Sequence, residues 1–236
     1  MRAAGTITPD EITGRNTVKM GEQVFLPGVV FTNVLLADEI NRTPPRTQAA
    51  LLEAMQERTV TVEGKSHQLP DPFLVIATQN PFEHEGIFPL PESQLDRFLF
   101  KIILDYADPE SEIEMLRLPH TGVTPDMLGE IQSLLGVVGL DKARADLDLT
   151  RVPDEVARYI VAIVRNTRQN PGLELGASSR AAIHLLSAAK AQARLGGRDH
   201  VTIEDVRDVA PYVLRHRLVC REGTTADEAL RAALDA

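Results

Sequence analysis

Two short apolar runs, each followed by polar side chains, stand out in the first half of the chain. The first, residues 34–37, is followed at once by Asp38 and Glu39, and the second, residues 73–77, leads to Asn80. Continuous apolar runs of this length are typical of parallel strands that are covered on both faces. Because a helical segment lies between them, the sequence predicts a right-handed strand–helix–strand unit with both polar ends at one edge of a sheet.

The segment between the two runs has the apolar spacing of a helix that extends to about Arg58. Thr43 is predicted to be its N-cap and Pro44 its first helical residue, a position where the missing N–H of proline costs nothing. The predicted inner face of this helix carries Ala50, Leu51, Ala54 and Met55.

Two further segments have the turn residues of β-hairpins. Residues 17–33 place Gly21 at a turn and Pro27-Gly28 at the close of the second strand. Residues 59–69 alternate apolar and polar side chains around a Glu63-Gly64 turn. The sequence therefore predicts two hairpin insertions in an α/β core.

Beyond Asp105 and Tyr106 the pattern changes from strands to helices, and we place a domain boundary there. Residues 1–106 are predicted to form an α/β core and residues 107–236 a helical lid. The basic run at residues 215–217 is interpreted as a solvated face. The predicted lid helices extend from Asp108 to about Leu118, near 126–135, from Pro153 to before Pro171, from Ser178 or Ser179 to Gly196, and from Thr202 to Pro211, with the rest of 119–150 irregular.

The paired acids after the first strand are the main candidate chemistry. Ligands of open α/β sheets bind at the carboxyl ends of strands. Two carboxylates there suit a magnesium–triphosphate site, in which one supports the metal and the other orients a water. Taken alone, Asp38 and Glu39 fit a strand that leaves into a polar turn equally well. The Asn80 amide on the next strand favours a site, and Arg97, on the following loop, suits an arginine finger for a neighbour's phosphate.

The chain resembles the MoxR family of AAA+ ATPases in three stretches, LLADEINRTPPRTQAALLEAMQERTVTVEG, FLVIATQNP and EGIFPLPESQLDRF. The matching segments extend from about Thr8 to Val219, which is nearly the whole chain. This resemblance implies an α/β, parallel-sheet AAA+ core with β-hairpin insertions, followed by an α-helical lid domain. It also implies an ATPase that uses ATP and Mg²⁺.

The resemblance gives the candidate residues of the core defined roles. Asp38 would support Mg²⁺ directly or through water, Glu39 would polarise the attacking water, and Asn80 would hold that water in line. Arg97 would act in trans, on the nucleotide of an adjacent subunit, which requires a ring; the family implies hexamers.

One residue of the lid joins this set. The run from Gly176 to Arg180 matches the family's sensor 2 motif, whose arginine touches nucleotide phosphate. The position of Arg180 in the first turn of its helix is mildly unfavourable for a cation, which makes sense beside an anion. Without the resemblance, Arg180 would be interpreted as a surface arginine.

Three functions remain open at this stage. The resemblance favours an ATP-hydrolysing, chaperone-like remodeller of a protein client in complex assembly or cofactor insertion, often beside a von Willebrand factor A domain partner. The alternatives are a non-hydrolysing AAA+-like scaffold or adaptor, and a metal-chelatase-like or helicase-like subunit of the same clade.

The phosphate-binding loop G-x-x-x-x-G-K-[ST] does not occur in the sequence. The run Gly64-Lys65-Ser66 comes nearest, but position 59 is Thr59, and the pattern there is that of a hairpin tip. In the family this loop precedes the part that resembles residues 1–15. We therefore expect a core that is incomplete at its N-terminus, and a chain that alone binds ATP weakly or not at all and is inactive.

Composition narrows the setting. The 236 residues are 43% hydrophobic and 25% charged, which is ordinary for a globular protein. The net charge of −9 argues against a general nucleic-acid binder, which would usually be basic. Cys220 is the single cysteine, and no apolar run approaches the ~20 residues of a membrane span or forms a signal peptide. The expectation is a soluble, cytoplasmic protein.

Overall fold

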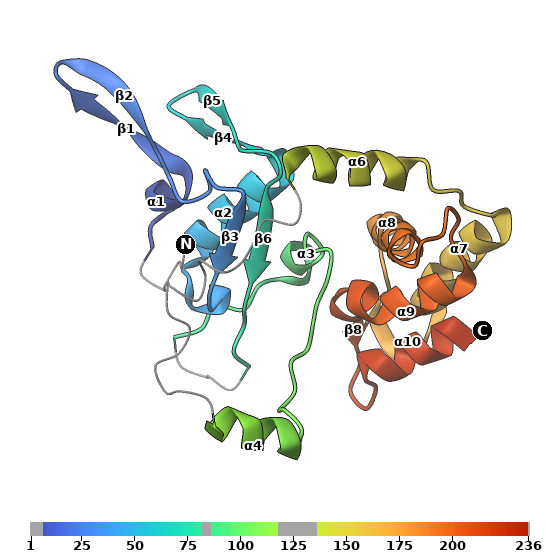
Figure 1. The fold of residues 1–236 in the computed structure, drawn as a ribbon. Helices are drawn as coiled ribbons and strands as arrows, with labels where there is room; N and C mark the ends of the chain where they lie inside the picture. The colour runs from blue at the N-terminus through green and yellow to red at the C-terminus, as the bar shows by residue number, and fades with distance from the viewer. Residues whose placement is uncertain (1–6, 82–85, 118–135, 236) are drawn as a thin grey trace. The chain divides into compact units, whose positions relative to one another are not determined.

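The computed structural model describes residues 7–81, 86–117 and 136–235 (Figure 1). Contacts divide the chain into two compact units, Met1–Arg97 and Phe98–Ala236. The first unit is an α/β core and the second a largely helical lid, so the predicted fold class is confirmed. The division falls before the boundary that was predicted after residue 106.

The centre of the core is a parallel strand pair. Strand β3 (Val34–Ala37) lies beside β6 (Leu74–Ala77), in register from Val34↔Leu74 to Ala37↔Ala77 (Figure 1). Helix α2 (Pro45–Glu57) connects them, as the pattern predicted. Complete burial was a wrong expectation: Leu35 is buried, but Val34 is 52% exposed and Leu74 54% exposed. In the described part of the chain this sheet has two strands, and only the face that bears Leu35 and Ala37 is covered.

Helix α2 begins one residue later than predicted. Pro44 is the N-cap rather than the first helical residue, with φ −56° and ψ 147°. The reason is Pro45, because the residue before a proline is pushed out of the helical region. Thr43 is buried instead of capping the helix. The buried face also differs from the prediction and consists of Thr47, Gln48, Leu51, Leu52 and Ala54.

Both predicted hairpins are present. Strands β1 (Gly14–Lys19) and β2 (Glu22–Pro27) form one, and β4 (Thr59–Val62) and β5 (Lys65–Gln68) form the other. Each tip has two residues with positive φ, Met20-Gly21 and Glu63-Gly64, which is the type I′ geometry that suits two-residue hairpins. Gly64-Lys65-Ser66 is thus a hairpin tip. The Glu63 carboxylate accepts hydrogen bonds from the Asn16 and Gln23 amides at 2.8 and 2.7 Å, which joins the two hairpins.

The lid has its own hydrophobic core. Its largest fully buried side chains include Ile163, Leu185, Val206 and Leu214. The predicted capping residues are confirmed, since Ser178 caps α8 and Thr202 forms a capping box with Asp205 on α9. The lid helices are α4 (Pro109–Arg117), α6 (Val137–Asp148), α7 (Asp154–Gln169), α8 (Ser179–Leu195), α9 (Ile203–Leu214) and α10 (Ala226–Asp235).

The lid differs from the prediction in four places. Helix α6 replaces part of the segment predicted as irregular, because glycine costs a helix only about 1 kcal/mol relative to alanine. Helix α9 continues through Pro211, where burial of Val213 and Leu214 offsets one lost hydrogen bond. Strands β7 (Leu173–Leu175) and β8 (Val219–Cys220) pair in a unit that was expected to be all helical, and α10 was not predicted. The helix predicted near 126–135 lies outside the described residues.

The basic run at residues 215–217 is mostly buried, so its interpretation as a solvated face was wrong. It forms the short 3₁₀ helix η2 (Arg215–Arg217). His216 is 8% and Arg217 5% exposed. Their partners include backbone carbonyls at Phe98 and Leu99, so the chain joins the lid from residue 98 onward. The run of basic residues in the sequence did not indicate that these side chains have carbonyl acceptors inside the lid.

Candidate functional site

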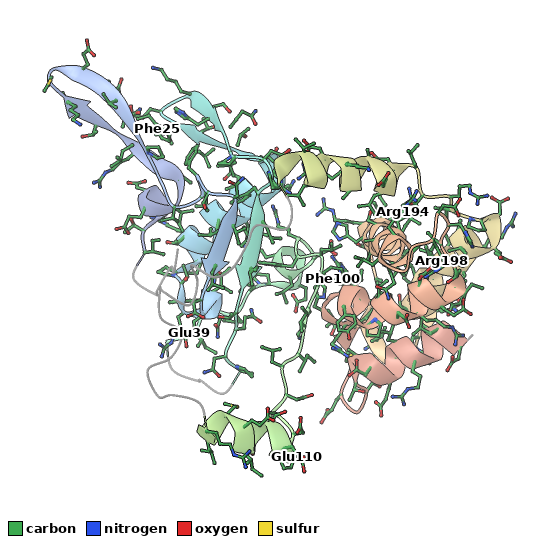
Figure 2. The ribbon with its side chains drawn as sticks, in the orientation of Figure 1. Phe25, Glu39, Phe100, Glu110, Arg194 and Arg198 are labelled. Atoms are coloured by element: carbon green, nitrogen blue, oxygen red, sulfur yellow. The ribbon has the colours of Figure 1, made fainter. Side chains whose placement is uncertain are left out.

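The ends of β3 and β6 stay linked by backbone hydrogen bonds beyond the strands themselves. The N–H of Thr78 donates to the carbonyl of Ala37 at 3.0 Å, and the N–H of Ile40 donates to the carbonyl of Thr78 at 3.0 Å. Figure 2 shows Glu39 at the end of β3. The parallel register thus brings Thr78 against the acid pair, at the carboxyl edge of the sheet where α/β proteins bind ligands.

The Thr78 hydroxyl bonds to both acidic residues. Its Oγ1 donates to Asp38 Oδ1 at 2.7 Å and accepts from the backbone N–H of Glu39 at 2.8 Å. One hydroxyl has one proton to donate and lone pairs to accept, so this pattern holds Asp38 as a hydrogen-bond acceptor and fixes the Glu39 peptide. Sequence reasoning missed Thr78. The available signal was a hydroxyl directly after the apolar run of the second strand.

Glu39 adopts an uncommon backbone conformation. Its φ of 52° and ψ of 52° lie in the left-handed region, which is rare for a residue other than glycine and costs of order 1 kcal/mol or more. Its side chain is 38% exposed and forms an ion pair with Arg42 at 3.2 Å. The carboxylate is therefore directed by a strained turn and stays accessible to solvent.

The predicted partner Asn80 lies on the same edge. Its backbone carbonyl accepts a hydrogen bond from the Asn41 amide at 3.3 Å, and Asn41 is buried in the turn that follows Glu39. The Gln48 amide supports this turn, because it donates to the carbonyls of Ile40 at 3.0 Å and Phe88 at 2.9 Å. Asn41 and Gln48 are two further residues that sequence reasoning did not single out.

Arg97 lies elsewhere on the core unit. It follows the short helix α3 (Glu92–Leu95), and its Nη1 donates to the Gln56 side chain and, at 3.4 Å, to the Leu52 carbonyl. Gln56 is in the last turn of α2, whereas Asp38 and Glu39 precede the first turn. At ~1.5 Å per residue, the eleven steps from Pro45 to Gln56 span roughly 16 Å. The structure of one subunit therefore does not bring Arg97 to the acid pair.

A pocket of about 340 Å³ lies beside the Arg97 side chain. Its lining residues are Ala49, Leu52, Glu53, Gln56, Glu57, Gln94 and Arg97. The pocket lies on α2 and the segment around α3, and neither acid of the pair lines it.

Arg180 belongs to the lid unit. It is exposed in the first turn of α8, one residue after the start of the helix. The N-cap Ser178 accepts a hydrogen bond from the N–H of Ala181 at 3.2 Å. The side chain of Arg180 is thus available to an anion, and its role as sensor 2 stays a prediction.

The donor set at the strand ends suits Mg²⁺. The described residues contain no group of three or more His, Cys, Asp or Glu that could hold a metal ion. Magnesium does not need three protein ligands, because it keeps several waters and binds through one or two carboxylates together with substrate phosphates. The Asp38 carboxylate, which Thr78 orients, would be the residue to supply such a ligand or to hold a water of the metal.

Family comparisons agree with this arrangement. Residues 2–100 match the ATPase family associated with various cellular activities (AAA). Residues 165–233 match the AAA lid domain. The fold is thus that of an AAA-type ATPase.

Individual relatives narrow the class. Uncharacterized protein YeaC of Bacillus subtilis is 41% identical over 98% of this chain and 73% of its own length. Chaperone MoxR1 of Mycobacterium tuberculosis is 43% identical over 94% of this chain and 60% of its own length. The crystal structure of a presumed ATPase from Cytophaga hutchinsonii has a TM-score of 0.88 and 34% identity, and covers 100% of this chain and 75% of that chain. The chain belongs to the MoxR family of AAA+ ATPases.

Among the described residues, no helix has both the length and the apolar character that a bilayer crossing requires.

Proposed function

We propose that the protein containing this chain hydrolyses ATP with Mg²⁺ at the edge formed by β3 and β6. The observation that carries the proposal is the Thr78 hydroxyl, which orients the Asp38 carboxylate and fixes the Glu39 backbone at the strand ends. Phosphoryl transfer depends on positioning and charge neutralisation rather than on covalent catalysis. A prearranged acid pair is what that chemistry needs.

Each core residue then has one task. Asp38 would hold the metal or one of its waters, and Mg²⁺ there would supply charge neutralisation for the phosphates. Glu39 accepts a hydrogen bond from the attacking water and polarises it. Asn80, next to Asn41 on the same edge, holds that water in line.

Two arginines complete the site in this proposal. Arg97 acts in trans on the nucleotide of the neighbouring subunit in a ring, most simply a hexamer. Its position on the far end of α2 from the acids supports a role outside its own site. Arg180 contacts phosphate from the lid, as its exposed position in the first turn of α8 allows.

The proposed task of the motor is to remodel a protein client. Membership in the MoxR family and the name of Chaperone MoxR1 support a chaperone-like role. Complex assembly or cofactor insertion, with a von Willebrand factor A domain protein as partner, is the setting we propose.

The 236-residue chain lacks the sequence of a phosphate-binding loop, which affects its expected affinity for ATP. No described residues form a G-x-x-x-x-G-K-[ST] loop, and such a loop supplies much of the grip on the β- and γ-phosphates. The 236-residue chain by itself is therefore expected to bind ATP weakly or not at all. Isothermal titration tests this, and a low-micromolar Kd would contradict it.

The decisive experiment is steady-state ATPase assay of the full-length protein. Glu39→Gln should lower kcat by ~10²–10⁴, the usual contribution of a general base. Arg97→Ala should lower it by ~10³–10⁵. The matched controls are Glu155→Gln and Arg158→Ala on the exposed face of α7, which should leave kcat unchanged. Full turnover by Glu39→Gln would exclude the proposed mechanism and favour a site elsewhere, and absence of turnover in the wild type would favour a scaffold.

A further inference from the structure

The first residues of the lid unit are held by two buried basic side chains, Arg217 and His216. Arg217 Nη2 donates to the carbonyl of Phe98 at 2.6 Å, and its Nη1 donates to the carbonyl of Leu99 at 3.3 Å. His216 Nε2 lies 3.0 Å from the same Phe98 carbonyl, which makes it a second donor. With Lys101 N–H donating to the Tyr212 carbonyl at 2.8 Å, residues 98–101 are fastened to the C-terminal end of α9 and to η2.

The buried guanidinium of Arg217 depends on specific hydrogen-bond acceptors. A guanidinium that is 5% exposed needs an acceptor for each donor, because burial of an unpaired charge is expensive. Arg217 finds further acceptors in the Val213 carbonyl and in His184 Nδ1, the latter at 2.6 Å. Arginine has no acceptor atom, so His184 Nδ1 must carry the lone pair in this contact. The guanidinium thus links η2, α9, α8 and the entering chain.

The residue that precedes this fastened segment is Arg97. Its guanidinium is bound within the core unit, to the Gln56 side chain and to the Leu52 carbonyl at 3.4 Å. Its Nε is buried and has no hydrogen-bond partner among the described residues. The backbone of Arg97 is therefore one peptide bond away from a carbonyl that lid side chains hold.

We propose that Arg217, together with His216, is a positioning residue for Arg97 and couples the lid to the arginine finger. This inference rests on the proposed function, in which Arg97 acts on the neighbour's nucleotide. A planar peptide leaves two soft dihedrals per residue, and consecutive Cα atoms are about 3.8 Å apart. Only a few dihedrals therefore separate the Phe98 carbonyl from the Arg97 backbone, and a shift of η2 that moves this carbonyl should also displace Arg97. Misplacement of a catalytic group by about 1 Å can cost ~10²-fold in rate.

The test is a double-mutant cycle in the ATPase assay of the full-length protein. Arg217→Lys keeps the charge but lacks the planar fork that spans the Phe98 and Leu99 carbonyls. It should lower kcat by about tenfold with KM for ATP unchanged, because an arginine finger stabilises charge that develops in the transition state. The matched control is Arg207→Lys, a lid arginine that bonds the Leu234 carbonyl and the Tyr159 hydroxyl instead. In an Arg97→Ala background, Arg217→Lys should have no further effect.

The outcomes separate this inference from the proposed function. If Arg97→Ala lowers kcat but Arg217→Lys does not, or if their effects multiply, the coupling is wrong and the ATPase mechanism stands. If Arg97→Ala leaves kcat unchanged, the finger assignment itself fails. Thermal unfolding checks the fold of each variant. Should Arg217→Lys unfold the lid, His216→Phe removes the second donor to Phe98 and must show the same kcat loss and the same dependence on Arg97.

Discussion

Two acid–arginine pairs, one in each unit, use the same chemistry in opposite ways. Glu39 and Arg42 in the core are 38% and 45% exposed and share one contact at 3.2 Å. In the lid, Asp205 is 3% exposed, and both of its oxygens bond to Arg198 while Oδ2 also accepts from the backbone N–H and hydroxyl of Thr202. The lid pair is thus built into the fold.

The difference indicates which carboxylate is free to do chemistry. Asp205 bonds to Arg198 and Thr202 within the lid, so a ligand that bound this carboxylate would break the capping box of α9. The Glu39 backbone is in the left-handed region, and its carboxylate has one exposed ion-pair partner, Arg42. Exposed ion pairs are worth only ~0–1 kcal/mol, so Glu39 can exchange Arg42 for a water at small cost. The structural acid Asp205 has both of its oxygens occupied by hydrogen bonds within the lid, whereas Glu39, the acid of the proposed mechanism, stays accessible.

The largest expected effect comes from breaking the lid pair. Asp205→Ala removes the capping box of α9 and leaves Arg198 without its carboxylate, and should lower the free energy of unfolding by about 2–4 kcal/mol. Urea or thermal unfolding of the full chain measures this. Asp208→Ala, an exposed acid on the same helix, is the control and should change it by less than about 0.5 kcal/mol. Equal losses of the free energy of unfolding for Asp205→Ala and Asp208→Ala would show that Asp205 is no more important to the fold than an exposed acid.

Deletion of the Thr78 hydroxyl tests the core side of the comparison. Thr78→Val keeps the side-chain shape but loses both bonds to the acid pair, and should lower kcat of the full-length ATPase by ~10²-fold. Thr78→Ser should retain most of the activity because it keeps the hydroxyl. Thr61→Val on the exposed side of β4 serves as control. An unchanged kcat for Thr78→Val would show that the acids need no such support.

The pH dependence of lid stability should be a smaller effect. Hydrogen bonds from His200 and Arg151 lower the pKa of Asp199 to about 2, from an ordinary value of 3.8. Because the pKa is lower in the folded state, the stabilisation is present above about pH 4 and is lost as the pH falls toward 2. Asp199→Asn should flatten the loss of stability across this window. A parallel pH profile for variant and wild type would contradict the assignment.

The smallest effect is expected for the exposed pair of the core. Arg42→Ala should change the free energy of unfolding by less than about 0.5 kcal/mol, as is usual for exposed i, i+3 pairs. Denaturant unfolding beside Asp205→Ala gives the comparison directly. A loss of 2 kcal/mol or more would mean that the Glu39 carboxylate is a structural group after all.

Much of the core could be predicted because its signals are local. The two strands follow from uninterrupted apolar runs, and the hairpins follow from Gly21 and Gly64, which tolerate the positive φ of tight turns. The start of α2 was misjudged by one residue, although the restriction that Pro45 imposes on Pro44 is also local. In the lid, capping by Ser178 and Thr202 was correctly predicted for the same reason, since a cap bonds within three residues.

The candidate site was predicted in part. Asp38 and Glu39 were identified from their place after an apolar run, and parallel pairing makes Asn80 their neighbour along the edge. The role of Thr78 was missed because its bonds depend on the register between two strands. The chemical roles of the acid pair and Asn80 remain predictions, as do the role of Arg97, which concerns an adjacent subunit, and that of Arg180 in the lid.

By itself, the sequence determined the order of strands, hairpins and helices, the acid pair and the family resemblance, because each depends on residues close together along the chain. Only the tertiary structure decided that Thr78 bonds to both acidic residues, that α9 continues through Pro211, and that Arg217 is buried against the Phe98 carbonyl. These features depend on which distant groups meet and whether each polar atom finds a partner. The local propensities of residues do not contain this information, because they do not depend on contacts between distant parts of the chain.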